Sequence, residues 1–344
     1  MKEGQWRRRD LDRGKTLGVL LVVLGHLVAR QDPSGPGWGA AWYEPLRASL
    51  YTFHIPFLFY LSGYAAGWSG AATVSGPAWA ALLQRRARHW LGPALLFGLA
   101  ILAGKCLVQG FLHVDHAPAS FAGGLVNLLW RTDDSPAQSV WYLVVLFAYA
   151  VCVPPLFTLL GERQVLLLAL SLAVMPLPLP PLLFADRLLL YLPFYLAGIL
   201  TERHDTGWCA FLDQQHSTLL GLFAIGFGLL LLLAAEGLLM RIPRAPLLLA
   251  ASALAIPALH AAVRRLAARL PPTLDWLCPH AFAIYLLNTI FIGLAKALLM
   301  TVMPWEARWF PLFAPLLLAA GILGPVAAQS LVGRRRAPAA HLLR

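Results

Sequence analysis

Long apolar runs separated by short polar stretches dominate the chain. We mark ten such segments, each close to the roughly twenty residues that a helix needs to cross a bilayer. They cover residues 16–30, 46–68, 91–112, 139–160, 164–182, 187–201, 217–236, 246–263, 279–303 and 308–332. The pattern predicts an all-α polytopic membrane protein with about ten transmembrane helices around a central cavity. We expect one domain over 1–344, with a cytoplasmic N-terminal segment at 1–15 and a basic cytoplasmic tail at 333–344.

The fifth and sixth segments are the least regular. The proline-rich stretch MPLPLPP, residues 175–181, interrupts the fifth, and the sixth is short. Because proline ends or bends a helix, these two segments are expected to be short or re-entrant. The pattern is therefore also compatible with nine or eleven crossings.

Lys and Arg residues gather in the loops on one side of the predicted helices. With the N-terminus inside, the inner ends and loops hold eighteen Lys and Arg, and the outer loops hold seven. Such an excess favours the cytoplasmic side, so both termini are expected there, in agreement with an even number of crossings.

Composition supports the same class. Hydrophobic residues make up 59% of the chain and charged residues 12%, against about a quarter in soluble domains. The net charge of +11 is clustered between apolar runs, which indicates membrane topology and excludes nucleic-acid binding. The bias toward Ala, Leu and Arg suggests a GC-rich bacterial source, hence a bacterial inner membrane.

Two ionisable side chains stand on the first apolar helix. Lys15 and His26 are eleven positions apart, about three turns, so they share a face and lie roughly 16 Å apart along the axis. Lys15 read alone is a snorkelling anchor, and His26 read alone an interhelical hydrogen-bonding group. An imidazole at membrane depth is also a functional hypothesis, because it titrates near neutral pH. Asp12 lies one turn before Lys15.

The second apolar segment contains FHIPFLFYLSGY, residues 53–64. Here His54 is a second imidazole at membrane depth, and Pro56 is expected to bend its helix toward a polar cavity. We expect His54 and His26 to face one cavity from neighbouring antiparallel helices.

A basic run, RRAR at residues 85–88, precedes the third segment. Arg85 and Arg88 are three positions apart and share a helix face. They are read either as topology anchors or as a fork that binds phosphates, a role that guanidinium groups fill well.

Together these motifs resemble the membrane acyltransferase-3 family, and within it the fucose 4-O-acetylase-like branch. The resemblance rests on Asp12, Lys15 and His26, on FHIPFLFYLSGY and on the Arg85-x-x-Arg88 pair. Weaker signatures follow in SVWYLVVLFAY (139–149), YLPFYLAG (191–198) and AIYLLN (283–288).

The resemblance implies an enzyme that moves an acyl group, acetyl first among the expectations, from cytoplasmic acyl-CoA to a hydroxyl of a surface or exported carbohydrate. Acetyl-CoA or another acyl-CoA would be the co-substrate, with no metal; the partners would be the carbohydrate acceptor and membrane lipids. The resemblance places the family's basic residue and histidine on Lys15 and His26, and its arginine pair on Arg85 and Arg88. The family's motif that corresponds to AIYLLN (283–288) often ends in histidine. Here that position is Asn288, which cannot shuttle a proton at neutral pH.

The chemistry needs a base for the acceptor hydroxyl, and His26 is our candidate. An acyl-imidazole intermediate is the alternative. Lys15, with Arg85 and Arg88, is expected to bind the CoA phosphates, while Asp12 orders the inner mouth and His54 assists the proton transfer. Ser62, Tyr64 and Asn288 are candidates for the oxyanion contact, and the sequence does not decide among them. Asp186 and Arg187 begin a short helix on the outer side and are read either as a local ion pair or as a contact for the sugar.

Other readings remain open. The outer loop residues His113, Asp115 and His116 are read as solvated rather than as a metal site. A glycan or lipid-intermediate transporter would show paired helix breaks in matching halves, and only 175–181 breaks a segment. A non-catalytic scaffold would tolerate replacement of Lys15 and His26.

Overall fold

The computed structural model describes residues 3–28, 42–111, 114, 117–137, 139–161, 163–269, 275–304 and 306–334. Over these ranges the chain is helical and forms no strand; Arg131 and Leu182 make one isolated bridge. The α-helices are α1 (Glu3–Gly25), α2 (Tyr43–Leu50), α3 (His54–Trp68), α4 (Gly76–Arg86), α5 (Gly92–Val108), α6 (Phe121–Leu129), α7 (Trp141–Leu160), α8 (Gln164–Val174), α9 (Ala185–Arg203), α10 (Asp205–Ala235), α11 (Arg244–Arg269), α12 (Ala281–Val302) and α13 (Phe310–Arg334). The predicted all-α class is confirmed.

In the described part of the chain, six helical stretches are long and apolar enough to cross a membrane. They are Gly76–Val108, Trp141–Leu160, Asp205–Ala235, Arg244–Arg265, Cys278–Val302 and Phe310–Leu331. The chain is therefore an integral membrane protein. The remaining predicted segments form helices that are shorter or carry charges: α3 has 15 residues and α8 has 11. About ten crossings thus remains a prediction.

Two predicted boundaries are wrong. The segment 46–68 is not one helix, because a turn at residues 51–53 separates α2 from α3. Pro56 consequently lies in the first turn of α3, where its missing N–H has no intrahelical partner to lose and no bend is needed. The segment 91–112 begins earlier than predicted, because α4, a π-turn at Ala87–Leu91 and α5 run on continuously.

The proline-rich stretch behaves as expected. Helix α8 ends at Val174, directly before the prolines, and α9 begins at Ala185. The fifth segment is accordingly a short helix in the structure.

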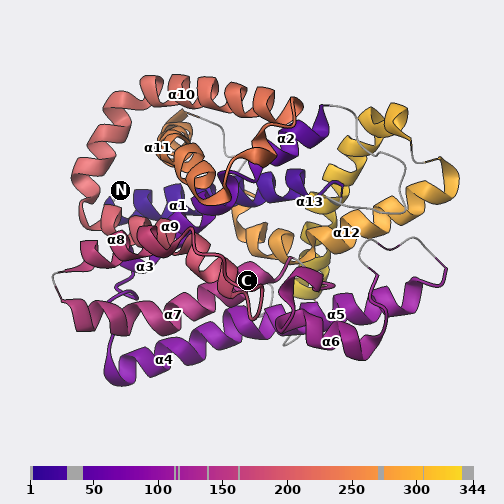
Figure 1. Cartoon of the computed structure of the whole chain (residues 1–344), viewed down its shortest axis with the longest axis horizontal. Helices are drawn as coiled ribbons and strands as arrows, with labels where there is room; N and C mark the ends of the chain where they lie inside the picture. The colour runs from indigo at the N-terminus through magenta and orange to yellow at the C-terminus, as the bar shows by residue number, and fades with distance from the viewer. Residues whose placement is uncertain are drawn as a thin grey trace.

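Helices α1, α3 and α9 lie between α10 at one edge of the molecule and α4 at the other (Figure 1). Helix α1 runs antiparallel to α3, with Gly14 against Leu61 and Gly18 against Leu58. Its small residues let the two backbones approach closely. This packing holds the two ends of α1 at opposite ends of α3.

Helices α3 and α9 run parallel and cross at Gly63 and Gly198. A Cβ atom on Gly63 would collide with the carbonyl of Tyr195, and one on Gly198 with the carbonyl of Tyr60. The fully buried side chains of α3, Phe57, Phe59 and Tyr60 among them, form the centre of the core. The site residues of α3 are therefore carried by a helix at the centre of the core.

Candidate active site

His26 follows the last residue of α1 and contacts α12. Its Nδ1 lies 2.9 Å from Oδ1 of Asn288, a residue with no exposed surface. The two residues are separated by 262 positions in the sequence, so only the packing of α1 against α12 brings them together.

The surroundings of Asn288 fix the proton on the His26 ring. The Asn288 amide nitrogen donates to the carbonyls of Ile284 (2.8 Å) and Tyr285 (2.7 Å) in its own helix. Its oxygen therefore faces His26 as an acceptor, and His26 Nδ1 must be the donor. In the neutral ring, Nε2 then carries the lone pair that a general base requires.

His54 is the first residue of α3 and is 1% exposed. Its Nδ1 donates to the carbonyl of Leu50 at 2.6 Å, and its ring packs edge-on against Tyr51. Among the described residues its buried Nε2 has no hydrogen-bond partner. His26 lies close enough to His54 for its charge to act on that ring, while the expectation that both face one cavity stays a prediction.

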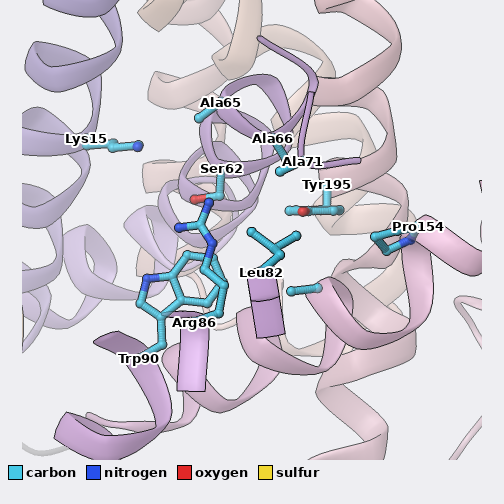
Figure 2. Close-up of a pocket in the computed structure, with 11 residues that line it drawn as sticks. Lys15, Ser62, Ala65, Ala66, Ala71, Leu82, Arg86, Trp90, Pro154 and Tyr195 are labelled. Carbon is cyan, nitrogen blue, oxygen red and sulfur yellow. The ribbon is translucent and has the colours of Figure 1, made fainter. Parts of the chain in front are cut away.

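A small cavity of about 80 Å³ lies toward the other end of α3 (Figure 2). At about 30 Å³ of liquid volume for each water, it has room for roughly three water molecules. Helices α1, α3, α4, α7 and α9 contribute to its wall. The lining residues are Lys15, Ser62, Ala65, Ala66, Ala71, Leu82, Arg86, Trp90, Ala150, Pro154 and Tyr195.

Two cations share this cavity. Figure 2 shows the Lys15 ammonium and the Arg86 guanidinium reaching into it from opposite helices. Arg86 lies over the ring of Trp90 at 4.1 Å, an attraction that holds the guanidinium in place. Within the described chain, no residue accepts a hydrogen bond from Lys15 or Arg86. Two partly buried positive groups in one cavity favour an anion such as a phosphate.

The predicted arginine fork lies elsewhere. Arg85 and Arg88 are both exposed and do not line the cavity, whereas the intervening Arg86 does. Arg85 and Arg88 are exposed on the outer side of this helical stretch, whereas Arg86 is half-buried and lies toward the cavity. Arg86 is thus the residue of this run that the structure brings to Lys15.

Three further predicted residues also have definite places. Asp12 is exposed, and its charge acts on Lys15. Ser62 lines the cavity and shares a 2.8 Å hydrogen bond with the Tyr142 hydroxyl. The Tyr64 hydroxyl instead donates to Asp205 Oδ1, outside the set of cavity-lining residues.

Arg187 lies in the first turn of α9, at the end of the α3–α9 pair where α3 begins. Its guanidinium sits 4.8 Å from the centre of the Trp141 ring. The predicted site residues therefore separate into a cavity with Lys15 and Ser62, a His26–Asn288 pair beside His54, and Arg187 near the α3 N-terminus.

Sequence reasoning missed Arg86, Trp90 and Tyr195 as cavity residues. The signal for the first two was present: Arg86 and Trp90 are four positions apart, the spacing at which helical side chains meet. Tyr195 carries no such signal, because α9 reaches the cavity only through its crossing with α3.

The described residues contain no group of three His, Cys, Asp or Glu side chains placed to hold a metal ion. His113, Asp115 and His116, read above as a solvated loop, lie outside the described residues, as does the tail from residue 335 onward.

Comparison with known proteins gives a family. No curated protein and no solved structure matched the chain. The family model described as an acyltransferase domain, acyltransferase 3, matches residues 8–329 and so spans every site described above. The chain therefore belongs to the acyltransferase-3 family and is a membrane acyltransferase.

Proposed function

We propose that the protein transfers an acyl group, acetyl in the first instance, from cytoplasmic acyl-CoA to a hydroxyl of a surface or exported carbohydrate. The branch of the family that it resembles, the fucose 4-O-acetylase-like one, suggests a sugar as the acceptor. The proposal includes a bacterial inner membrane with both termini in the cytoplasm, as the distribution of Lys and Arg favours.

The observation that supports this proposal best is the hydrogen bond between His26 and Asn288. It leaves His26 Nε2 as a basic nitrogen inside an apolar bundle. In the reaction, Nε2 takes the proton of the acceptor hydroxyl while the oxygen attacks the thioester carbonyl. The C–S bond then breaks, and the CoA thiolate takes the proton back from the imidazolium. The products are the ester and free CoA, with His26 restored.

The separation of the two polar centres fits a long donor. Lys15 and His26 are roughly 16 Å apart along α1, at 1.5 Å per residue. Acyl-CoA bears its phosphates and its thioester at opposite ends of an extended arm. Lys15 and Arg86 would hold a phosphate at one centre, and the thioester would reach His26 at the other.

The test uses purified protein in nanodiscs with radiolabelled acetyl-CoA and a pool of glycans. We expect label on the glycan and stoichiometric CoA release in the wild type, and loss of both in His26→Gln. The matched control is His204→Gln, because His204 is exposed and lies at the end of α9.

Full transfer by a folded His26→Gln variant would remove the catalytic assignment. Uptake of unmodified glycan into sealed proteoliposomes of the same protein, without CoA release, would instead support the transporter reading.

A further inference from the structure

A second polar cluster lies where α9 begins, near the start of α3. Asp186 and Arg187 occupy the first turn of α9, Arg244 opens α11, and Asp133 approaches from the segment after α6. Arg187 lies 3.9 Å from Asp186 and 4.0 Å from Asp133, measured between nitrogen and carboxylate oxygen. At these distances the charges form ion pairs, but the atoms are too far apart for hydrogen bonds.

The cluster leaves hydrogen-bonding capacity unused. The Arg187 side chain is 16% exposed, yet none of its N–H groups is hydrogen-bonded to another described residue. The Oδ1 atom of Asp186 is buried, and no described residue donates to it. Arg244, in contrast, donates to the Tyr191 hydroxyl at 3.2 Å. Buried polar groups are normally paired, so a donor and an acceptor left side by side indicate a bound molecule that supplies both.

Aromatic rings hold the Arg187 guanidinium in position without using its N–H groups. Arg187 lies over the ring of Trp141 and within 5.4 Å of the centre of the Phe184 ring. A cation–π contact of this kind holds the guanidinium in place and uses none of its N–H groups. Such a preorganised group loses little entropy when a ligand binds.

Aromatic contacts join this cluster to the proposed base. Trp141 packs edge-on against Tyr142, and the Tyr142 and Tyr285 rings are 5.6 Å apart. Tyr285 is also an electrostatic neighbour of Arg187 and lies one turn before Asn288, the partner of His26. A ligand held at Arg187 would thus lie near the part of α12 that contains Tyr285 and Asn288, and Asn288 is the residue that binds His26.

We propose that Asp186, Arg187 and Arg244 form the acceptor subsite of the enzyme and bind an uncharged pyranose. The inference rests on the proposed function and names its substrate class. A sugar hydroxyl both donates and accepts, so one hydroxyl can bridge Asp186 Oδ1 and the Arg187 guanidinium. The carboxylates of Asp186 and Asp133 disfavour a uronic acid at the same place.

The experiment measures binding apart from transfer. Calorimetric titration of the His26→Gln protein in nanodiscs uses neutral methyl pyranosides of the gluco, galacto, manno and fuco series, with methyl glucuronide as the anionic counterpart. We expect a neutral pyranoside to bind. Its affinity should fall about tenfold or more in the Asp186→Ala variant and less in Asp186→Asn, which keeps an acceptor oxygen. Asp134→Ala, an exposed carboxylate of the same segment, should stay within about twofold.

Each other outcome is decisive. No binding of any neutral pyranoside, unchanged affinity in both Asp186 variants, or tighter binding of the glucuronide would overturn the subsite. Acetyl-CoA binding, measured in parallel, shows that the variants are folded. If a pyranoside binds through Asp186 but the wild type transfers no acetyl group to it, the proposed function fails while the subsite stands.

Discussion

At the scale of single residues, the amide of Asn288 decides which nitrogen of His26 is basic. The sequence made this position doubtful, because asparagine cannot act as a base. In the structure, Asn288 acts through His26: its nitrogen is committed to two carbonyls of α12, so its oxygen accepts the Nδ1 proton. In the proposed mechanism it is a positioning residue and not a catalytic one.

Replacing Asn288 tests this role. In Asn288→Leu the imidazole loses its orienting acceptor, and we expect kcat for acetyl transfer to fall about 100-fold, within the range that a positioned base contributes. The KM for acetyl-CoA should stay within about twofold. Steady-state kinetics measure both. A parallel change of KM and Kd for acetyl-CoA would instead indicate a general disturbance of the fold.

A second residue-scale prediction separates Arg86 from its neighbours. Arg86→Ala should raise the Kd for CoA about tenfold, because it removes one of the two cations of the cavity, and binding should become less dependent on salt. Equilibrium binding of CoA at two salt concentrations measures this. If the Arg85→Ala, Arg88→Ala double variant weakens binding more than Arg86→Ala, the fork predicted from the sequence is the phosphate site.

At the scale of elements, the crossing of α3 and α9 sets the geometry of the site. Gly63 and Gly198 let the two backbones touch, which places Ser62 and Tyr195 in the same cavity wall. Both glycines lie against backbone carbonyls, which cannot move aside as a flexible side chain can.

Adding one methyl group at this crossing should therefore be costly. We expect Gly63→Ala to destabilise the protein by about 3 kcal/mol, the upper range for overpacking. Gly221→Ala on α10, where a Cβ meets no atom within 4 Å, is the matched control. It should change stability by less than about 1 kcal/mol and in the stabilising direction. Thermal unfolding in detergent compares the two, and equal loss in both variants would contradict the crossing as the cause.

At the scale of the whole molecule, ion pairs connect helices α1, α10 and α11, which are far apart in the sequence. Arg264 of α11 binds Asp213 of α10 at 2.8 Å and Asp10 of α1 at 3.4 Å. Burial raises the pKa of Asp10 from 3.8 to about 6, although the nearby Arg264 and Arg13 act to lower it. The carboxyl of Asp10 therefore titrates in a pH range that is accessible to stability measurements.

The sign of the effect follows from the direction of this shift. A carboxyl whose pKa is higher in the folded state stabilises the fold fully below pH 3.8 and loses that contribution as the pH rises through about 6. We expect the unfolding temperature of the wild type to fall between about pH 4 and pH 6, and that of Asp10→Asn to fall less. Scans of both proteins across this range provide the measurement. Parallel curves would show that Asp10 does not titrate there.

The sequence by itself determined the features that depend on residues close together along the chain. Apolar runs fixed the all-helical membrane class, the prolines after Val174 ended α8, and the spacing of Lys15 and His26 followed from one helix. Only the tertiary structure decided the partners. The pairing of His26 with Asn288, and the presence of Arg86 rather than Arg85 or Arg88 in the cavity, depend on how α1, α4 and α12 pack. Helical periodicity is a local property of the chain, whereas side-chain contacts between helices are set by packing across hundreds of positions.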